Sequence, residues 1–548
     1  MAGFMQSIRR LLSRGQNTQH QGLPICEALE GRLLLAGTIE AVLAGGTLTL
    51  VGDELGNRIT VTALADGKVR VTGDGTTING AAQYDTPAAV TGDIRIYLKG
   101  DNDYVRVDGV EVAKSLTIDS GDGGDTVLLD TITVNKKVYI QGGTGNDSVD
   151  LSGATVEGDV TLADTEHSDY SVRDSHFKRN LIVVGSDALG INDSFSASDL
   201  IVDGNVTVNN GDGNSSFRFT MTDGAPAIGG NLTIRCGEGS DYLDVISASV
   251  NGAVSAEFGL GSGDHILNVE GSTVGKGIKL ANDDGMTSLL IRNGSSVTGN
   301  VSFKSGTDDA VLAIDHGDVA GNITFASKTG YAQFDARNGF SITGNLKVQS
   351  GDRTSVTLAN APIEDALAGG LSVKGGAGSD SLMIVNVSVG GKVALSYGDG
   401  GSTVTMNPAA HLQSSLSLKA GVGVDTMNLL EAVLDGKATI STGDGDDLFM
   451  VNDTTFNAAV AIYTGDDADT LDVEMIDTFA GQVTAFEQGL TLSCGDGGDI
   501  VALGNAGEGE MVAFGKASTL DGGAGDDTCL TALAPGSMTP TEINFEDI

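Results

Sequence analysis

Residues 142–150 read Gly-Gly-Thr-Gly-Asn-Asp-Ser-Val-Asp, and the same pattern, Gly-x-Gly-x-Asp before an alternating apolar segment, recurs about every 22 residues. It returns around Asp125, Asp380, Asp447 and Asp527. One copy of such a repeat cannot bury its own apolar face, so neighbouring copies must stack on one another. The repeat therefore predicts a solenoid.

A second pattern, apolar-x-Gly-x-apolar-x-apolar, accompanies the first, as in residues 156–162 and 342–348. Apolar residues at a spacing of two indicate a strand with one buried face, and the glycine indicates a bend or a close approach of backbones. The position two after the recurring Asp is apolar along the chain, and we expect it to point inward as a ladder. Its members are Val105, Val127, Val149, Leu243, Leu382, Met427, Phe449, Leu471 and Val501.

These patterns predict an all-β fold, a right-handed parallel β-helix (β-solenoid) of about 21 coils that forms a rod roughly 100 Å long. Two weaker coils near residues 57 and 80 are included in that number. The predicted domains are a basic leader at 1–36, a single solenoid at 37–535 and a tail at 536–548. Four coils are longer than the rest, near 220–230, 358–370, 474–488 and 504–516; such insertions carry binding functions or are tolerated surface variation.

The composition is strongly acidic, with 31 Lys and Arg against 73 Asp and Glu and a net charge of −42. That charge argues against nucleic acid as a partner and favours cations. With 5% aromatic residues and no Trp, the chain is also poorly equipped for sugar binding on aromatic platforms. No apolar run is long enough to predict a transmembrane span.

The four cysteines do not form a disulfide framework. Cys236 and Cys494 precede equivalent glycines on coils that we expect to lie roughly 50 Å apart, too far for a bridge. Cys529 takes an apolar position of the repeat, and Cys26 lies in the leader. The cysteines therefore leave the redox compartment open.

The first 36 residues are basic and partly amphipathic, which on composition alone is compatible with a disordered tail. Residues 29–35, Leu-Glu-Gly-Arg-Leu-Leu-Leu, resemble the LEPR-XLL leader of large exported bacterial proteins, with Gly31 in place of the usual proline. The resemblance implies export, and hence an extracellular or cell-surface location, with ordered structure from about Gly37.

The Gly-Asp loops resemble the RTX (hemolysin-type) calcium-binding nonapeptide, Gly-Gly-x-Gly-x-Asp-x-apolar-x, which residues 142–150, 375–383 and 522–530 match. The resemblance implies Ca²⁺ as a cofactor, held by glycine carbonyls and aspartate oxygens, which are the hard ligands this ion prefers. RTX arrays repeat every nine residues, whereas this pattern comes once per coil and gives a single column of loops. The candidate metal ligands are Asp125, Asp147, Asp241, Asp380, Asp425, Asp447, Asp469, Asp499 and Asp527.

Two arguments about these aspartates point in different directions. Carboxylates stacked about 5 Å apart repel each other, which favours a bound cation. Gly and Asp are also common turn formers, and an Asp side chain can accept a bond from a nearby backbone amide. Calcium ligation and turn formation therefore both remain open from the sequence.

No catalytic motif accompanies the repeat. The six histidines are scattered, and no metal-binding His pair, Gly-x-Ser-x-Gly elbow, phosphate-binding loop or CxxC pair is present. Acidic residues are too abundant to single out an acid–base pair, and the basic patch at residues 176–179 has the pattern of a surface turn. We expect a non-catalytic exported rod with a surface, adhesive or envelope-structural role, whose partners are cations, surface polymers or other envelope proteins. The alternatives are a calcium-responsive secreted RTX-like module and a polysaccharide-active β-helix enzyme.

Overall fold

The computed structural model describes residues 37–185, 192–222, 226–259, 261–475 and 483–546. The predicted leader, with Cys26 and the LEPR-like segment, lies outside the described residues. The same holds for the middle of the long coils near 220–230 and 474–488.

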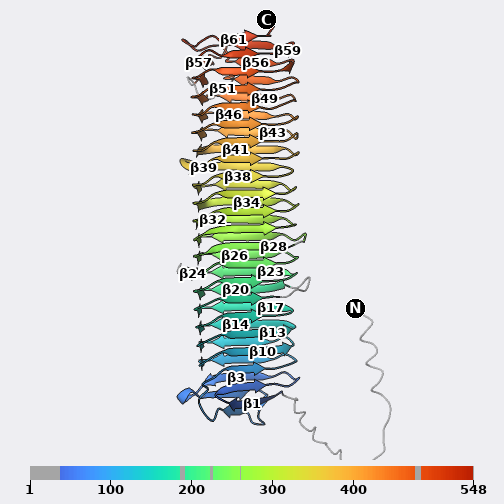
Figure 1. Cartoon of the computed structure of the whole chain (residues 1–548), viewed down its shortest axis with the longest axis vertical. Coiled ribbons are helices and arrows are strands. Elements are labelled where there is room, and N and C mark those ends of the chain that lie inside the picture. Colours follow the sequence, from blue (N-terminus) through green and yellow to red (C-terminus); the bar gives the residue numbers. More distant parts are fainter. Residues whose placement is uncertain (1–36, 186–191, 223–225, 260, 476–482, 547–548) are drawn as a thin grey trace, which may run out of the picture. The chain divides into compact units, whose positions relative to one another are not determined.

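The described chain from Gly37 onward is a β-solenoid of about 19 turns with a period of about 22 residues (Figure 1). A typical turn has a long strand, a second strand after the Gly-Asp corner, and a short third strand. One turn consists of β10 (Leu116–Asp122), β11 (Thr126–Asp130) and β12 (Thr133–Val134). The next consists of β13 (Val138–Thr144), β14 (Asn146–Ser152) and β15 (Thr155–Val156), which pair in parallel with their counterparts.

The predicted inward ladder is confirmed. Val127 pairs with Val105 on one side and with Val149 on the other, and the same column holds Met427, Phe449, Leu471 and Val501 near the far end. All nine predicted members are buried. Aromatic rings extend the core elsewhere, where Phe456, Phe486 and Phe514 stack with centroids 4.8 and 5.4 Å apart.

The start of the solenoid differs from the expected coils. The coil near residue 57 is present, because β3 (Arg58–Ala63) pairs in parallel with β8 (Tyr104–Asp108). The expected coil near residue 80 is absent: β4 (Val69–Gly73) turns back antiparallel to β3, and β6 (Gln83–Asp85) is antiparallel to β4. The solenoid has about 19 turns where about 21 were expected, and the missing coil near residue 80 accounts for part of the difference.

The end of the solenoid also differs, since the expected tail contains a strand. β61 (Thr541–Ile543) pairs in parallel with β58 (Thr519–Asp521) and continues the sheet beyond residue 535. Of the long coils, 358–370 falls largely within β39 (Thr354–Leu367), whose pairing shifts register twice. Near 504–516 the chain makes a small turn closed by an antiparallel bridge between Asn505 and Glu510.

A second corner, between the second and third strands, has one residue with positive φ in most coils. Glycine, Asn or Asp is common there, as in Gly153 (φ 62°), Asp174 (φ 49°) and Asn338 (φ 57°). Ala409 (φ 57°) and Glu431 (φ 52°) show that other residues are forced into the same conformation. Successive coils therefore turn at this corner through one left-handed residue.

Candidate functional site

The recurring aspartates point into the solenoid. Asp147 lies two residues before the inward Val149 on β14, and residues two apart on a strand share a face. All nine predicted metal-binding aspartates have an exposed fraction between 0% and 3%. The structure therefore brings them into a buried column, interrupted in the middle of the solenoid, which we call the aspartate ladder; Asp103 and Asp193 belong to it as well.

Each bond in this ladder links two coils. The backbone N–H at the ladder position of one coil donates to Oδ1 of the aspartate in the next coil, at 2.5 to 3.0 Å. The donor–acceptor pairs among the described residues are Asn57–Asp103, Asp103–Asp125, Asp125–Asp147, Ser168–Asp193, Thr354–Asp380, Ser402–Asp425, Asp425–Asp447, Asp447–Asp469, Asp469–Asp499 and Asp499–Asp527. The amides that lack a strand partner at the corner are thereby satisfied.

The second carboxylate oxygen is poorly satisfied. Oδ2 of Asp447 and of Asp469 is buried and lacks a hydrogen bond of ordinary geometry. Burial is the main influence and raises the pKa of Asp447 to about 7 and that of Asp469 to about 6, although the neighbouring hydroxyls of Thr442 and Thr464 act in the opposite direction. Burial likewise raises the pKa of Asp103 to about 7. Asp103, Asp447 and Asp469 therefore hold protons more readily than ordinary aspartates.

One coil places a second carboxyl group against the ladder. Asp164 occupies the position equivalent to Gly142, and a Cβ built on Gly142 would lie 2.4 Å from Oδ2 of Asp147 and 2.8 Å from Oδ2 of Asp164. Burial is the main cause that raises the pKa of both groups, and the two buried carboxylates interact directly. We expect this pair to hold a proton near neutral pH.

The ladder changes character in the middle of the solenoid. Asp241 faces the imidazole of His265 instead of an amide, with Nδ1 and Oδ2 3.1 Å apart and both side chains at most 1% exposed. His265 also stacks on Phe258, with ring centroids 4.5 Å apart. The following coils carry Thr287, Ala310 and Ala332 at this position, so the column of aspartates is interrupted there.

The glycines of the corner are required by close packing of successive coils. Gly143 has φ 114°, and a Cβ there would lie 1.8 Å from the carbonyl oxygen of Gly121 in the preceding coil. Gly523 repeats the arrangement against Gly495, at 1.7 Å. Only glycine fits such positions.

The buried aspartates of the ladder and the exposed aspartates on the outer side of the same corner differ in how well they could bind calcium. Among the described residues, no three His, Cys, Asp or Glu side chains are grouped so that they could hold a metal ion. Of the nine buried aspartates, all except Asp241 use one carboxylate oxygen, Oδ1, to accept a backbone N–H of the preceding coil. The exposed carboxylates of Asp444, Asp466 and Asp496 form a separate column on the outer side of the same corner. Calcium binding at these coils stays a prediction.

A second inter-coil ladder was not anticipated from the sequence. At the corner that leads into the first strand, Asn side chains accept the backbone N–H of the following coil: Asn205 donates to Asn180 at 2.9 Å, and Asn231 donates to Asn205 at 2.8 Å. Asn300, Asn322 and Asn345 repeat the pattern. Its signal was available, because Asn follows the glycine of the apolar-x-Gly-x-apolar pattern in each of these coils except that of Asn180, which follows Arg179.

The remaining predicted features are separate from the ladder. In residues 176–179, Phe177 is buried in the core while Arg179 is exposed, as a surface turn requires. Cys236, Cys494 and Cys529 are free thiols. No helix among the described residues has the length and apolarity needed to cross a membrane.

Comparison with known proteins adds no relative. No family model, curated protein or solved structure matches the chain. The residues and their geometry are therefore the basis for any functional conclusion.

Proposed function

We propose that this protein is a non-catalytic exported rod with a structural or adhesive role at the cell surface. The observation that carries the proposal is the aspartate ladder. The most frequent carboxylates of the repeat bond one coil to the next inside the solenoid, and they are buried from any substrate. Because the recurring aspartate bonds each coil to the next, the solenoid is suited to keep a long, rigid shape.

The LEPR-like leader motivates the proposed location. The test is to express the full chain in its native host and label intact cells with an antibody against the solenoid. We expect surface labelling, and retention inside the cell after Leu33, Leu34 and Leu35 are replaced by Ser. Wild-type protein that stays in the cytoplasm would contradict the proposal.

A calcium-responsive rod is the second candidate, favoured by the outer column of Asp444, Asp466 and Asp496. These exposed carboxylates lie on successive coils, whose spacing is about 4.8 Å, and repel one another without a counter-ion. Backbone carbonyls of the glycine corner lie beside them and are suitable ligands. The candidate site is thus the outer face of the corner, next to the ladder.

We expect Ca²⁺ to raise the thermal midpoint of the full chain relative to a chelator, by several degrees, and Mg²⁺ to do so less. The triple variant D444N/D466N/D496N should lose the response. A variant with the same charge change at exposed residues away from this corner, D66N/D203N/D318N, should keep it. An unchanged wild-type midpoint with Ca²⁺ would remove this candidate and leave the rod proposal intact.

A further inference from the structure

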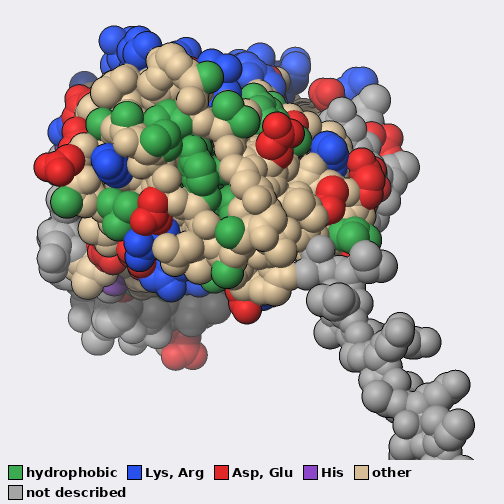
Figure 2. Space-filling model, turned by 90° about the horizontal axis from the view of Figure 1, so that it is seen from below, with side chains coloured by type: hydrophobic (Ala, Val, Ile, Leu, Met, Phe, Trp, Pro, Cys, Tyr) green, Lys and Arg blue, Asp and Glu red, His purple; other side chains and the backbone are tan. Residues whose placement is uncertain are grey.

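The corner between the third strand of one coil and the first strand of the next carries basic residues in three of four consecutive coils. We call residues 113–115, 135–137, 157–159 and 178–180 the basic corner. It holds five basic residues and two acidic ones on a chain with a net charge of −42: Lys114, Lys136, Lys137, Lys178 and Arg179 against Glu157 and Asp159. Seen end-on from the β1 (Thr38–Ala44) end, basic side chains of the solenoid gather along one edge, while acidic ones are spread more widely (Figure 2).

In one column of the basic corner, a glycine without a side chain stands between two basic residues. The pairings Val138–Val160 and Val160–Leu181 place Lys136, Gly158 and Arg179 in one column. Gly158 is buried, and a Cβ there would lie 2.2 Å from the carbonyl oxygen of Lys136. The coil between the two cations therefore presents only backbone, and stacked coils put Lys136 and Arg179 roughly 10 Å apart along the rod.

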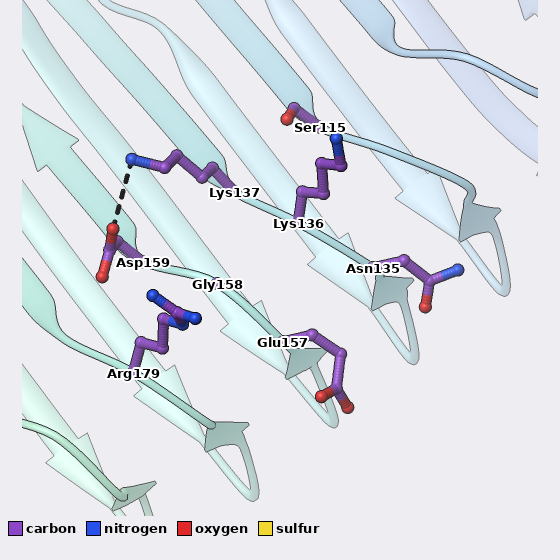
Figure 3. Close-up of a pocket in the computed structure, with 8 residues that line it drawn as sticks. All are labelled: Ser115, Asn135, Lys136, Lys137, Glu157, Gly158, Asp159 and Arg179. Carbon is purple, nitrogen blue, oxygen red and sulfur yellow. Dashed lines mark ion pairs between the residues drawn. The ribbon is translucent and has the colours of Figure 1, made fainter.

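A groove of about 300 Å³ lies over Gly158, and residues of four consecutive coils, from Ser115 to Arg179, line it. Figure 3 shows the Arg179 side chain directed toward Gly158, while Lys136 extends toward Ser115. Lys137 is engaged elsewhere, since its Nζ lies 3.2 Å from Oδ2 of Asp159. Lys136 and Arg179 form no ion pair with any described residue, so both keep donors available to a ligand.

We propose that this groove binds an acidic glycan, a saccharide chain that carries carboxylate or sulfate groups. The exposed guanidinium of Arg179 and the ammonium of Lys136 would bind two such groups, one on each side of Gly158. Glu157 and Asp159 also line the groove, and their carboxylates accept hydrogen bonds from hydroxyl groups.

The mixed lining selects among anions. Glu157 and Asp159 repel a bare inorganic anion, whereas a sugar acid supplies hydroxyl donors for them and negative groups for the cations. Recognition by charge also does not require the aromatic platforms that this chain lacks. The groove runs along the stack of coils, as an extended chain requires.

This inference goes beyond the proposed structural role and does not depend on calcium, because the groove is at a different corner from the Gly-Asp loops. The full-length protein is titrated in chelator at low salt with four probes: a galacturonate hexamer, a sulfated heparin-derived hexamer, neutral maltohexaose and inorganic phosphate. We expect binding of one or both acidic hexamers and none of maltohexaose or phosphate at the same concentrations. The preferred hexamer identifies the acidic group.

The variant K136Q/R179Q removes both free cations while leaving the fold unchanged, since both side chains are exposed. Each lost charge-assisted hydrogen bond is worth roughly a tenfold change in affinity, so we expect roughly a hundredfold weakening. The matched control is K276Q, because Lys276 is exposed in the same column and continues the backbone pairing from Gly252. It should bind within about twofold of the wild type.

Three results would overturn the proposal. They are binding of phosphate as tight as that of the acidic hexamers, equal affinity of wild type and K136Q/R179Q, and absence of binding by either acidic hexamer. Thermal unfolding of each variant confirms that a lost affinity does not reflect a lost fold.

Discussion

Asp447 belongs to the ladder in two ways, because its carboxylate accepts the Asp425 amide at 2.8 Å and its own amide donates to Asp469 at 2.9 Å. Replacing Asp447 by Ala leaves the Asp425 N–H buried without a partner, which costs roughly 1–3 kcal/mol. D447N keeps an acceptor oxygen in place and removes a buried charge. We therefore expect D447A to lower the thermal midpoint clearly and D447N to lower it less.

The measurement is thermal unfolding followed by circular dichroism, in chelator, for the wild type and both variants. D444A is the control, since Asp444 is exposed on the same loop. Equal losses for D447A, D447N and D444A would show that the inter-coil bond does not contribute to stability.

The direction of these side chains could have been predicted from the sequence, but the partner could not. Asp147 and Val149 are two residues apart, so a prediction that Val149 points inward places Asp147 inward too. The sequence does not contain the pairing register, and only the register shows that the carboxylate meets an amide of the preceding coil. Calcium ligation and amide bonding use the same residues, and the local pattern is compatible with both.

At the scale of elements, the left-handed corner stores strain where its residue is neither glycine nor Asn or Asp, which tolerate this conformation. Ala409 has φ 57°, a conformation that is unfavourable for a residue with a Cβ by roughly 1–2 kcal/mol. We expect A409G to raise the free energy of unfolding of its region by about 1 kcal/mol, after the greater chain entropy of glycine is subtracted. The next residue is the control: Ala410 is buried and has no positive φ, so A410G should destabilise.

Thermal or denaturant unfolding of the two glycine variants measures both effects. If A409G and A410G destabilise equally, the left-handed conformation at Ala409 carries no strain.

Strand stacking was predictable at this scale, whereas strand direction at the start was not. Alternating apolar residues show which face of a strand is buried, and the ladder from Val105 to Val501 follows from that alone. The same alternation occurs in β4, where Val69 and Val71 are buried, although this strand runs antiparallel to β3. Alternation does not reveal strand direction, so it predicts a parallel coil near residue 80, where β4 and β6 in fact run antiparallel to their neighbours.

For the molecule as a whole, the ladder makes stability depend on pH. The folded pKa of Asp103, Asp147 and Asp447 lies above the ordinary value of 3.8, so the folded state binds more protons than the unfolded state between about pH 4 and 8. Stability from these groups is greatest below that window and is lost as the pH rises through it. Surface ion pairs make stability depend on pH only below this window, because their carboxylates titrate there: the hydrogen bond from Arg70 holds the pKa of Asp85 below 3.8.

We therefore expect a higher thermal midpoint at pH 5 than at pH 8, in chelator and constant salt. The double variant D103N/D447N should show a smaller difference between the two pH values, because two of the titrating groups are gone. A wild-type midpoint that rises from pH 5 to pH 8 would contradict the assignment of raised pKa values to the ladder.

The bonds of the ladder all have the same polarity: the amide of an earlier coil donates, and the aspartate of the following coil accepts. A coil is therefore complete only when its successor has been laid down. For a chain that is synthesised or threaded through a pore from its N-terminus, assembly is vectorial, with order advancing one coil behind the newest segment. Each added coil stabilises the one before it through this bond. Folding of successive coils on the far side of a pore would therefore oppose backward movement of the chain.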